Sequence, residues 1–296
     1  MAEKLLLGIE IGTFESKGTL VKPDGEVVAS AAVGHEMSIP KPGWAEHDAE
    51  KVWWHDFVHL CRDIFSQPGV DPALVAGVGV SAIAPCVLPV DKDGRALRPG
   101  ILYGVDTRAT KEIEYFESTL GRETIFKNCA SVLSSQAAGP KILWIKNNES
   151  DVWSQTAKIL TGSGYLTYRL TGEFTIDIYT AVGYAPLLDV NKIDWDAAVV
   201  ESFMFIEQLP RLLWSAEVAG VVTSEAAGQT GIPAGTPVIA GTADAAAEAL
   251  STGLSQTGDL MLMYGSTIFL IQKTDKLVRT EKLWSAVFLE PGTYAV

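Results

Sequence analysis

The chain has 296 residues, of which 47% are hydrophobic and 20% are charged. This length is enough for one large or two ordinary globular domains with a sizeable core. The formal net charge of -13 argues against binding of nucleic acid or of an anionic membrane through the general field of the protein, so any phosphate must be held locally.

The cysteines and the apolar segments indicate the compartment. Cys61, Cys86 and Cys129 are far apart and form no CxxC pair, so neither a disulfide framework nor a zinc knuckle is indicated. The apolar run at the start is too short for a signal peptide, and no run reaches the roughly 18 residues of a membrane span. We therefore expect a cytoplasmic protein.

Three short strands are predicted at the start of the chain, over residues 5–11, 18–22 and 27–33, as an antiparallel meander. Glu10 ends the first strand, Gly12 and Thr13 stand in the turn, and Lys17 follows it. Such a turn can offer N–H groups and a hydroxyl to phosphate oxygens, while Glu10 can hold a hydrated Mg²⁺. A purely structural Gly-Thr turn is the alternative, because such turns are common between strands.

A helix is predicted over residues 48–66, with Asp48 as its cap and one apolar stripe. Two motifs near it are misleading. His55 and His59 imitate a zinc-hydrolase motif, but no third ligand can be named. Gly77 and Gly79 imitate a dinucleotide-binding motif, but they lie within a predicted strand instead of opening a helix, which excludes that interpretation.

Strands are predicted over residues 75–82 and 86–90, and a helix begins near residue 108 and runs to about 120. Tyr103, Asp106 and Arg108 cluster where a strand gives way to this helix, a position suited to contacts with a polyhydroxylated ligand. An Asp-capped helix start with a solvated Arg is the structural alternative. Residues 140–171 are predicted to be mostly helical and residues 174–181 extended.

The most informative stretch is 236–253, TPVIAGTADAAAEALSTG. It predicts a buried strand over 237–240, a tight turn over 241–243 and a helix from Asp244 onward. Asp244 thus stands at the carboxyl end of a strand and in the first turn of a helix, where open α/β sheets bind ligands. The helix dipole is expected to keep Asp244 ionised and available as a base. A plain helix cap is the alternative.

A second hairpin is predicted beyond this stretch, with strands over 259–263 and 267–272 and a Gly-hydroxyl tip. The residues of this tip are Gly265, Ser266 and Thr267. Two such tips facing each other across a cleft, with Asp244 between them, would hold a triphosphate from both sides.

Several segments together resemble the FGGY family of carbohydrate kinases, members of the actin, Hsp70 and sugar kinase superfamily. The matching segments include GIEIGTFESKGTLVKPDGEVVA, PGWAEHDAEKVWW, GYLTYRLTGEFTIDIYTA, PVIAGTADAAAEALSTG and YGSTIF. They are collinear and span nearly the whole chain. The resemblance implies an α/β fold with a ribonuclease H-like mixed sheet flanked by helices. It also implies an N-terminal domain over 1–253 and an incomplete C-terminal domain over 254–296.

The resemblance implies phosphorylation of a sugar or polyol hydroxyl, as in xylulose or a related carbohydrate, by ATP with Mg²⁺. Asp244 then matches the catalytic base and Glu10 the carboxylate that works through the metal. The first phosphate loop corresponds to Gly12, Thr13 and Lys17, the second to Gly265, Ser266 and Thr267, and the substrate side to Tyr103, Asp106, Arg108 and Ala245.

The sequence departs from the family pattern at several positions. Glu10 replaces the usual Asp, and Ile83, Ala84 and Pro85 stand where a polar pair is common. Ala245 replaces the Asn or Gln that often follows the base. These departures leave the substrate open. They also leave open a second interpretation, a non-catalytic regulatory member of the same fold that binds sugar or nucleotide.

The length is a further departure, because two such domains require roughly 500 residues. We therefore expect an isolated fragment or a natural truncation that binds ATP poorly and turns over little. Uncovered apolar strands, such as residues 261–263, are expected to favour a homodimer or aggregates.

Overall fold

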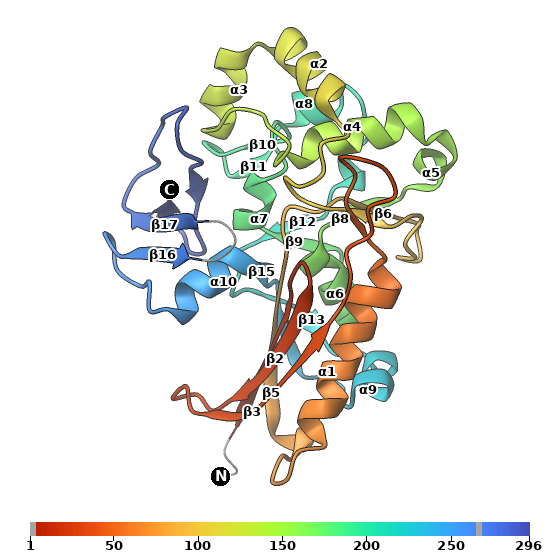
Figure 1. Cartoon of the computed structure of the whole chain (residues 1–296), viewed down its shortest axis with the longest axis vertical. Coiled ribbons are helices and arrows are strands. Elements are labelled where there is room, and N and C mark those ends of the chain that lie inside the picture. Colours follow the sequence, from red (N-terminus) through yellow and green to blue (C-terminus); the bar gives the residue numbers. More distant parts are fainter. Residues whose placement is uncertain (1–3, 265–267) are drawn as a thin grey trace.

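The computed structural model describes residues 4–264 and 268–296. Its centre is a seven-stranded mixed sheet of order β13-β14-β5-β1-β2-β3, with β15 beside β5 (Figure 1). The strands are β1 (Leu5–Ile11), β2 (Glu15–Val21), β3 (Val27–Gly34), β5 (Val75–Ala82), β13 (Val218–Val221), β14 (Pro237–Ile239) and β15 (Thr242–Ala243).

The first three strands form the predicted antiparallel meander, and β5 adds to β1 in parallel. Alternate residues of β1 are buried, as expected for a strand with one face on the core. The register places Glu10 opposite Lys17 on β2 and opposite Ser81 on β5. The second strand begins at Glu15, earlier than predicted, so the turn between β1 and β2 is short.

The helix predicted over residues 48–66 is present, and it packs against β2 and β3. It starts with a π-helical turn, Ala49–Trp54, and continues as α1 (His55–Phe65). Asp48 caps it, since its side chain accepts the N–H groups of Glu50 and Lys51. The imitation zinc motif on α1 gains no support, because no cluster of three metal-ligating side chains occurs among the described residues.

Five helices gather at the end of the molecule away from the N-terminus (Figure 1): α2 (Thr110–Leu120), α3 (Arg122–Cys129), α4 (Ala138–Asn148), α5 (Ser150–Gln155) and α8 (Ala197–Val200). The helices α6 (Gly162–Thr171) and α7 (Ile178–Val182) lie nearer the middle, and α9 (Ser224–Thr230) contacts α1. Single helical turns occur at Pro72–Leu74 and Ile206–Gln208. Short strands join them: β4 (Glu46–His47), β6 (Leu88–Val90), β7 (Gly100–Ile101), β8 (Lys158–Leu160), β9 (Thr175–Asp177), β10 (Leu188–Asp189), β11 (Asp194–Trp195) and β12 (Arg211–Leu213).

Two predictions for this region are wrong in part. Residues 158–160 form β8, which pairs with β6 instead of continuing a helix. The extended segment stops at Asp177, whose side chain accepts the N–H of Thr180 and so starts α7. In both places long-range pairing or a cap decides the structure, which an apolar pattern does not reveal.

The stretch predicted to carry the base differs from a strand-turn-helix unit in one detail. Thr242 and Ala243 are not a turn but the strand β15, which pairs with the end of β5. Gly241 supplies the bend between β14 and β15, with φ of +77°. A Cβ there would lie 2.2 Å from the Val80 carbonyl oxygen, so only glycine fits. The helix α10 (Asp244–Ser251) follows directly.

A second sheet of order β16-β17-β19-β18 lies beside α10, at the left of Figure 1. Its strands are β16 (Leu260–Tyr264), β17 (Ile268–Thr274), β18 (Ala286–Val287) and β19 (Tyr294–Ala295). The predicted hairpin is confirmed as the antiparallel pair of β16 and β17. In the part of the chain that is described, no helix is long and apolar enough to cross a bilayer.

Candidate active site

Asp244 is the first residue of α10, directly after β15. It is not the helix cap, because the cap position belongs to Ala243, which has no side chain to accept a hydrogen bond there. One Asp244 carboxylate oxygen instead accepts the N–H of Ala245 at 2.9 Å. The side chain lines a cavity of about 400 Å³ that also contacts Phe269 and Ile271 of β17. The acid therefore lines a space that is bordered by both α10 and the second sheet.

The electrostatics of Asp244 differ from the sequence-based expectation. Burial raises the pKa of its carboxyl to about 7, and the nearby charges of Glu10 and Glu248 act in the same direction. The N–H of Ala245 opposes this rise but does not cancel it. Asp244 is therefore only partly ionised near neutral pH, because desolvation outweighs the opposing hydrogen bond, and its role as a base stays a prediction.

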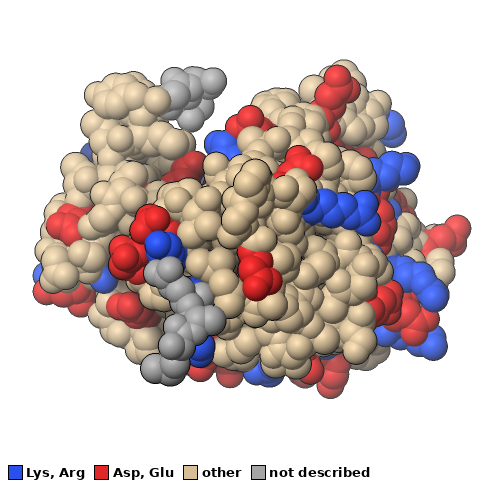
Figure 2. Space-filling view, turned by 90° about the horizontal axis from the view of Figure 1, so that it is seen from below, with Lys and Arg blue, Asp and Glu red and all other residues tan. Residues whose placement is uncertain are grey.

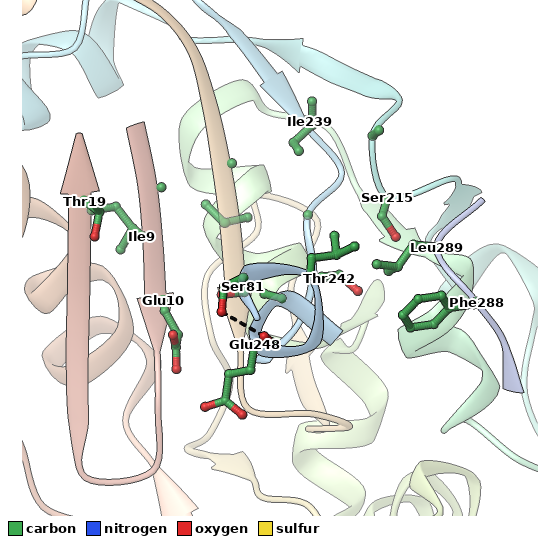
Figure 3. A pocket seen from close by; sticks show the side chains of 18 of the residues that line it. Ile9, Glu10, Thr19, Ser81, Ser215, Ile239, Thr242, Glu248, Phe288 and Leu289 are labelled. Atoms are coloured by element: carbon green, nitrogen blue, oxygen red, sulfur yellow. Dashed lines mark hydrogen bonds between the residues drawn. The ribbon is translucent and has the colours of Figure 1, made fainter. Parts of the chain in front are cut away.

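Glu10 and Glu248 line a second, larger cavity of about 570 Å³ (Figure 3). Glu10 comes from β1 and Glu248 from α10, and in the close-up both side chains point toward the same end of the cavity. Burial raises the pKa of Glu10, and the Glu248 carboxylate raises it further. A pair of carboxylates that repel each other is a suitable donor set for a divalent cation with oxygen ligands.

The turn between β1 and β2 contains the first predicted phosphate loop. The Gly12 N–H donates to the Glu15 carbonyl oxygen at 3.0 Å, and a Cβ on Gly12 would lie 2.6 Å from that oxygen. The Thr13 hydroxyl lies 3.1 Å from the Tyr103 hydroxyl. Lys17 is exposed, pairs with Glu15 at 3.4 Å and lines the larger cavity together with Glu10. Of the predicted loop residues, Lys17 shares this cavity with Glu10, whereas Gly12 and Thr13 line neither of the two cavities.

Asp106 and Arg108, predicted on the substrate side, are fully buried and paired with each other at 2.7 Å. Arg108 also pairs with Glu46 at 2.8 Å and lies over the Trp44 ring. Asp106 accepts the Ala45 N–H at 2.7 Å. Neither side chain lines either of the two cavities described above. This placement favours a structural role, and contact with substrate stays a prediction.

Some of the other residues singled out from the sequence lie at the smaller cavity itself. Ala245 lines the smaller cavity beside Asp244, as do Ala84 and Pro85. Ile83 is buried in the core. The second predicted phosphate loop, Gly265, Ser266 and Thr267, lies outside the described residues.

Several cavity residues were missed by the sequence analysis. Glu248 had a usable signal, since it lies four residues after Asp244 and hence on the same side of the helix. Tyr179 and Thr180 line the smaller cavity from α7, and Gln136 and Trp284 line it from distant segments. No local pattern marks these four residues, because only the tertiary fold brings them to Asp244.

Comparison with known proteins agrees with this architecture. Residues 5–251 match the family model described as the N-terminal domain of the FGGY family of carbohydrate kinases. Among curated proteins, the chain is 30% identical to a xylulose kinase of Escherichia coli (strain K12) over 264 residues, which is 89% of this chain and 53% of that protein. It is 26% identical to a glycerol kinase of Thermococcus gammatolerans over 94% of this chain and 55% of that one.

A solved structure shows the same fold. The crystal structure of a xylulose kinase from Rhodospirillum rubrum superposes with a TM-score of 0.93 at 28% identity, covering 99% of this chain and 59% of that one. The chain spans about half the length of the curated relatives it matches. The family model covers most of the chain, and the fold agrees over nearly all of it. The chain therefore belongs to the FGGY family of carbohydrate kinases and has their actin- and Hsp70-like fold.

Proposed function

We propose that the protein transfers the terminal phosphoryl group of ATP to a hydroxyl of a sugar or polyol, with Asp244 as the general base. The observation that carries this proposal is the position of Asp244 at the head of α10, in a cavity lined by both the first domain and β17. The xylulose and glycerol kinases among the relatives support the reaction class.

The pKa of Asp244 suits a general base. A group with a pKa of about 7 is partly deprotonated at neutral pH and still basic enough to take a hydroxyl proton. In the proposed step the acceptor oxygen forms a bond to the terminal phosphorus and its proton passes to an Asp244 carboxylate oxygen. The bond from that phosphorus to the leaving oxygen breaks, and ADP departs with the electron pair.

The larger cavity is proposed as the phosphate and metal side. Glu10 and Glu248 fit Mg²⁺, because two partly buried carboxylates with mutual repulsion gain from an intervening cation. Bound Mg²⁺ would neutralise charge on the phosphates. Gly12, Thr13 and Lys17 would bind phosphate oxygens through N–H, hydroxyl and ammonium groups, and Gly265, Ser266 and Thr267 would do so from the second sheet.

The distribution of charged side chains on the surface is consistent with local binding of phosphate. The face drawn in Figure 2 carries Lys and Arg side chains scattered among Asp and Glu, and its described residues form no continuous basic area. A triphosphate would therefore be held by the loop and by metal, and not by a general positive field.

The smaller cavity has a character suited to a carbohydrate acceptor. Its lining includes the polar residues Ser134, Gln136 and Thr180 and the aromatic residues Tyr179 and Trp284. The two rings meet edge to face at 5.5 Å between centroids. Hydroxyls can bond to the polar groups while C–H groups pack on the rings. We propose a pentulose such as xylulose, or a related sugar or polyol, as the acceptor.

A non-catalytic binding module is the second candidate. Ala245 and Ala84 give the cavity fewer hydrogen-bonding groups than the family pattern predicts, which favours a protein that binds sugar or nucleotide without turnover. The intact and partly buried Asp244 favours the enzyme.

The proposal also covers the roles of the two parts of the chain, the cellular location and the oligomeric state. We propose residues 1–253 as the acceptor-side domain and 254–296 as part of the nucleotide side. The buried free thiols of Cys61, Cys86 and Cys129 are consistent with the cytoplasm. Leu260 and Leu262 of β16 are exposed and would be the contact surface of a homodimer.

The test is an ADP-release screen of the full-length protein across pentuloses, hexuloses and polyols, followed by Asp244→Asn with the best acceptor. We expect the variant to lose roughly 10²- to 10⁴-fold in kcat while its acceptor affinity, measured by calorimetry, stays within a few-fold. Asp151→Asn, an exposed position at the start of α5, is the matched control. ADP release by Asp244→Asn at the wild-type rate would overturn the role of Asp244.

A further inference from the structure

A buried polar cluster lies directly beneath the first loop and is not part of the site described above. His35, just after β3, forms an ion pair with Asp56 on α1, with 2.8 Å between His35 Nδ1 and Asp56 Oδ2. The two side chains are only 6% and 3% exposed. The Ser16 hydroxyl of β2 donates to the same carboxylate oxygen at 2.8 Å. The cluster therefore joins β2, β3 and α1 under the turn.

The partners of His35 determine its protonation. Nδ1 faces the Asp56 carboxylate at 2.8 Å, and Nε2 faces the Gly12 carbonyl oxygen at 3.2 Å. A carboxylate and a carbonyl can only accept hydrogen bonds, so both ring nitrogens must donate. This assigns His35 as an imidazolium cation.

The ionisation of the Asp56 carboxyl agrees with this assignment. Burial alone would raise the pKa of the carboxyl, but hydrogen bonds from His35, Ser16 and His55 outweigh burial and hold the pKa below its usual range. Asp56 is then a carboxylate, and the shared proton lies on the His35 ring.

The neighbouring His47 differs from His35 in its charge. The His47 ring lies edge to face with His35, with 5.0 Å between centroids. Its Nδ1 accepts the indole N–H of Trp53 at 3.1 Å, which requires a neutral ring. Burial, followed by the charge of His35, lowers the pKa of His47 to about 4. Of two adjacent buried histidines, one is a cation and the other is neutral.

The His35 cation fixes the orientation of a loop peptide. Because C=O and N–H of a trans peptide point in opposite directions, a Gly12 carbonyl turned toward His35 leaves the Thr13 N–H turned away from it. Among the described residues, no backbone carbonyl accepts that N–H. The His35 N–H also donates to the Phe14 carbonyl oxygen at 2.9 Å, so the ring and its backbone hold both sides of the turn.

We propose that His35 is a positioning residue, an imidazolium held by Asp56 behind the first loop, which turns the Thr13 N–H outward to bind a phosphate oxygen of the nucleotide. It also places one positive charge behind the loop, in a chain of net charge -13. The inference rests on the proposed kinase function for the identity of the anion. The groups facing the pair are His47 of β4, His55 on the other Asp56 oxygen, and the Ser16 hydroxyl.

Nitrogen-15 NMR of the imidazole rings tests the charge without any assay of activity. The chain has 4 histidines, so His35→Gln and His47→Gln assign both rings. At pH 7 we expect two protonated nitrogens on His35 and one on His47. A neutral His35 ring at pH 7 would overturn the proposal.

The effect on the loop is measured with MgATP as the probe. In the full-length protein we expect His35→Gln to weaken ATP binding in calorimetry roughly tenfold, as for loss of a well-oriented hydrogen bond to a charged group. The KM for the acceptor should stay within a factor of two. His59→Gln, at an exposed position on α1, is the control.

Unchanged ATP affinity in His35→Gln, with the variant folded by circular dichroism, would contradict the proposal. Absence of phosphotransfer to every acceptor would count against the proposed kinase reaction alone, because the ring protonation and the ATP affinity are measured independently of turnover.

Discussion

Asp244 and Glu248 lie one turn apart on α10, yet Asp244 lines the smaller cavity and Glu248 the larger one. The same side of α10 therefore presents one carboxylate to each cavity, Asp244 on the proposed acceptor side and Glu248 on the proposed phosphate side. The two acids remain electrostatically linked, since Glu248 raises the pKa of Asp244 as well as that of Glu10.

This link predicts the pH dependence of activity. A base must be deprotonated to act, so kcat/KM should rise with pH and level off above the Asp244 pKa of about 7. Glu248→Gln removes one negative charge and should move the rising limb to lower pH by roughly half a unit. Glu114→Gln, exposed on α2, should leave the limb in place, and an unmoved limb in Glu248→Gln would refute the coupling.

Asp177 is predicted to hold β15 in place. Its Oδ2 accepts the Thr180 N–H at 3.2 Å and the hydroxyls of Ser215 and Thr242 at 3.1 and 2.9 Å. Asp177→Ala leaves these donors unpaired and should lower the free energy of unfolding at pH 7 by at least roughly 3 kcal/mol in urea titrations. Asp177→Asn keeps an acceptor oxygen and should cost less. Equal losses in the two variants would show that the hydrogen bonds do not matter.

The same carboxyl predicts a pH effect with a definite sign. Burial raises the pKa of Asp177 to about 6, above the value of about 3.9 in an unfolded chain. The folded state then binds the proton more tightly, so stability from this group is present below about pH 4 and is lost as pH rises toward 6. Relative to Asp177→Asn, the wild type should become less stable across that interval.

Tyr179 is predicted to contact the acceptor. It lines the smaller cavity, packs between Trp284 and Phe288, and its hydroxyl bonds to no other described residue. Tyr179→Phe should raise the acceptor KM by roughly tenfold and leave the ATP KM unchanged, since a site built around a hydroxyl loses a specific hydrogen bond. Tyr115→Phe, exposed on α2, is the matched control. A change confined to the ATP KM would place Tyr179 on the other side of the site.

His47 predicts a loss of stability in acid. The folded pKa of about 4 lies below the unfolded value of about 6.5, so the unfolded state binds more protons between these values. Stability from this group is complete above about pH 6.5 and should fall by up to roughly 3 kcal/mol as pH drops to 4. His47→Gln should flatten this dependence in denaturant titrations at pH 7.5 and 5. If the free energy of unfolding fell by the same amount between pH 7.5 and 5 in the wild type and in His47→Gln, His47 would be excluded as the cause of the acid instability.

The sequence by itself determined the elements with strong local signals. The meander of β1 to β3, the helix capped by Asp48, the hairpin of β16 and β17, and Asp244 at the start of α10 all follow from periodicity, turn residues and caps, which act over a few neighbouring residues. The family resemblance came from the order of such segments along the chain.

The tertiary structure alone decided what depends on distant residues. The pairing of β15 with β5, the ion pair of Glu46 with Arg108, and the approach of Tyr179 and Trp284 to Asp244 join segments tens of residues apart. Burial also makes Asp244 only partly ionised at neutral pH, because the desolvation that raises its pKa to about 7 depends on the atoms packed around it and leaves no mark in its neighbouring sequence.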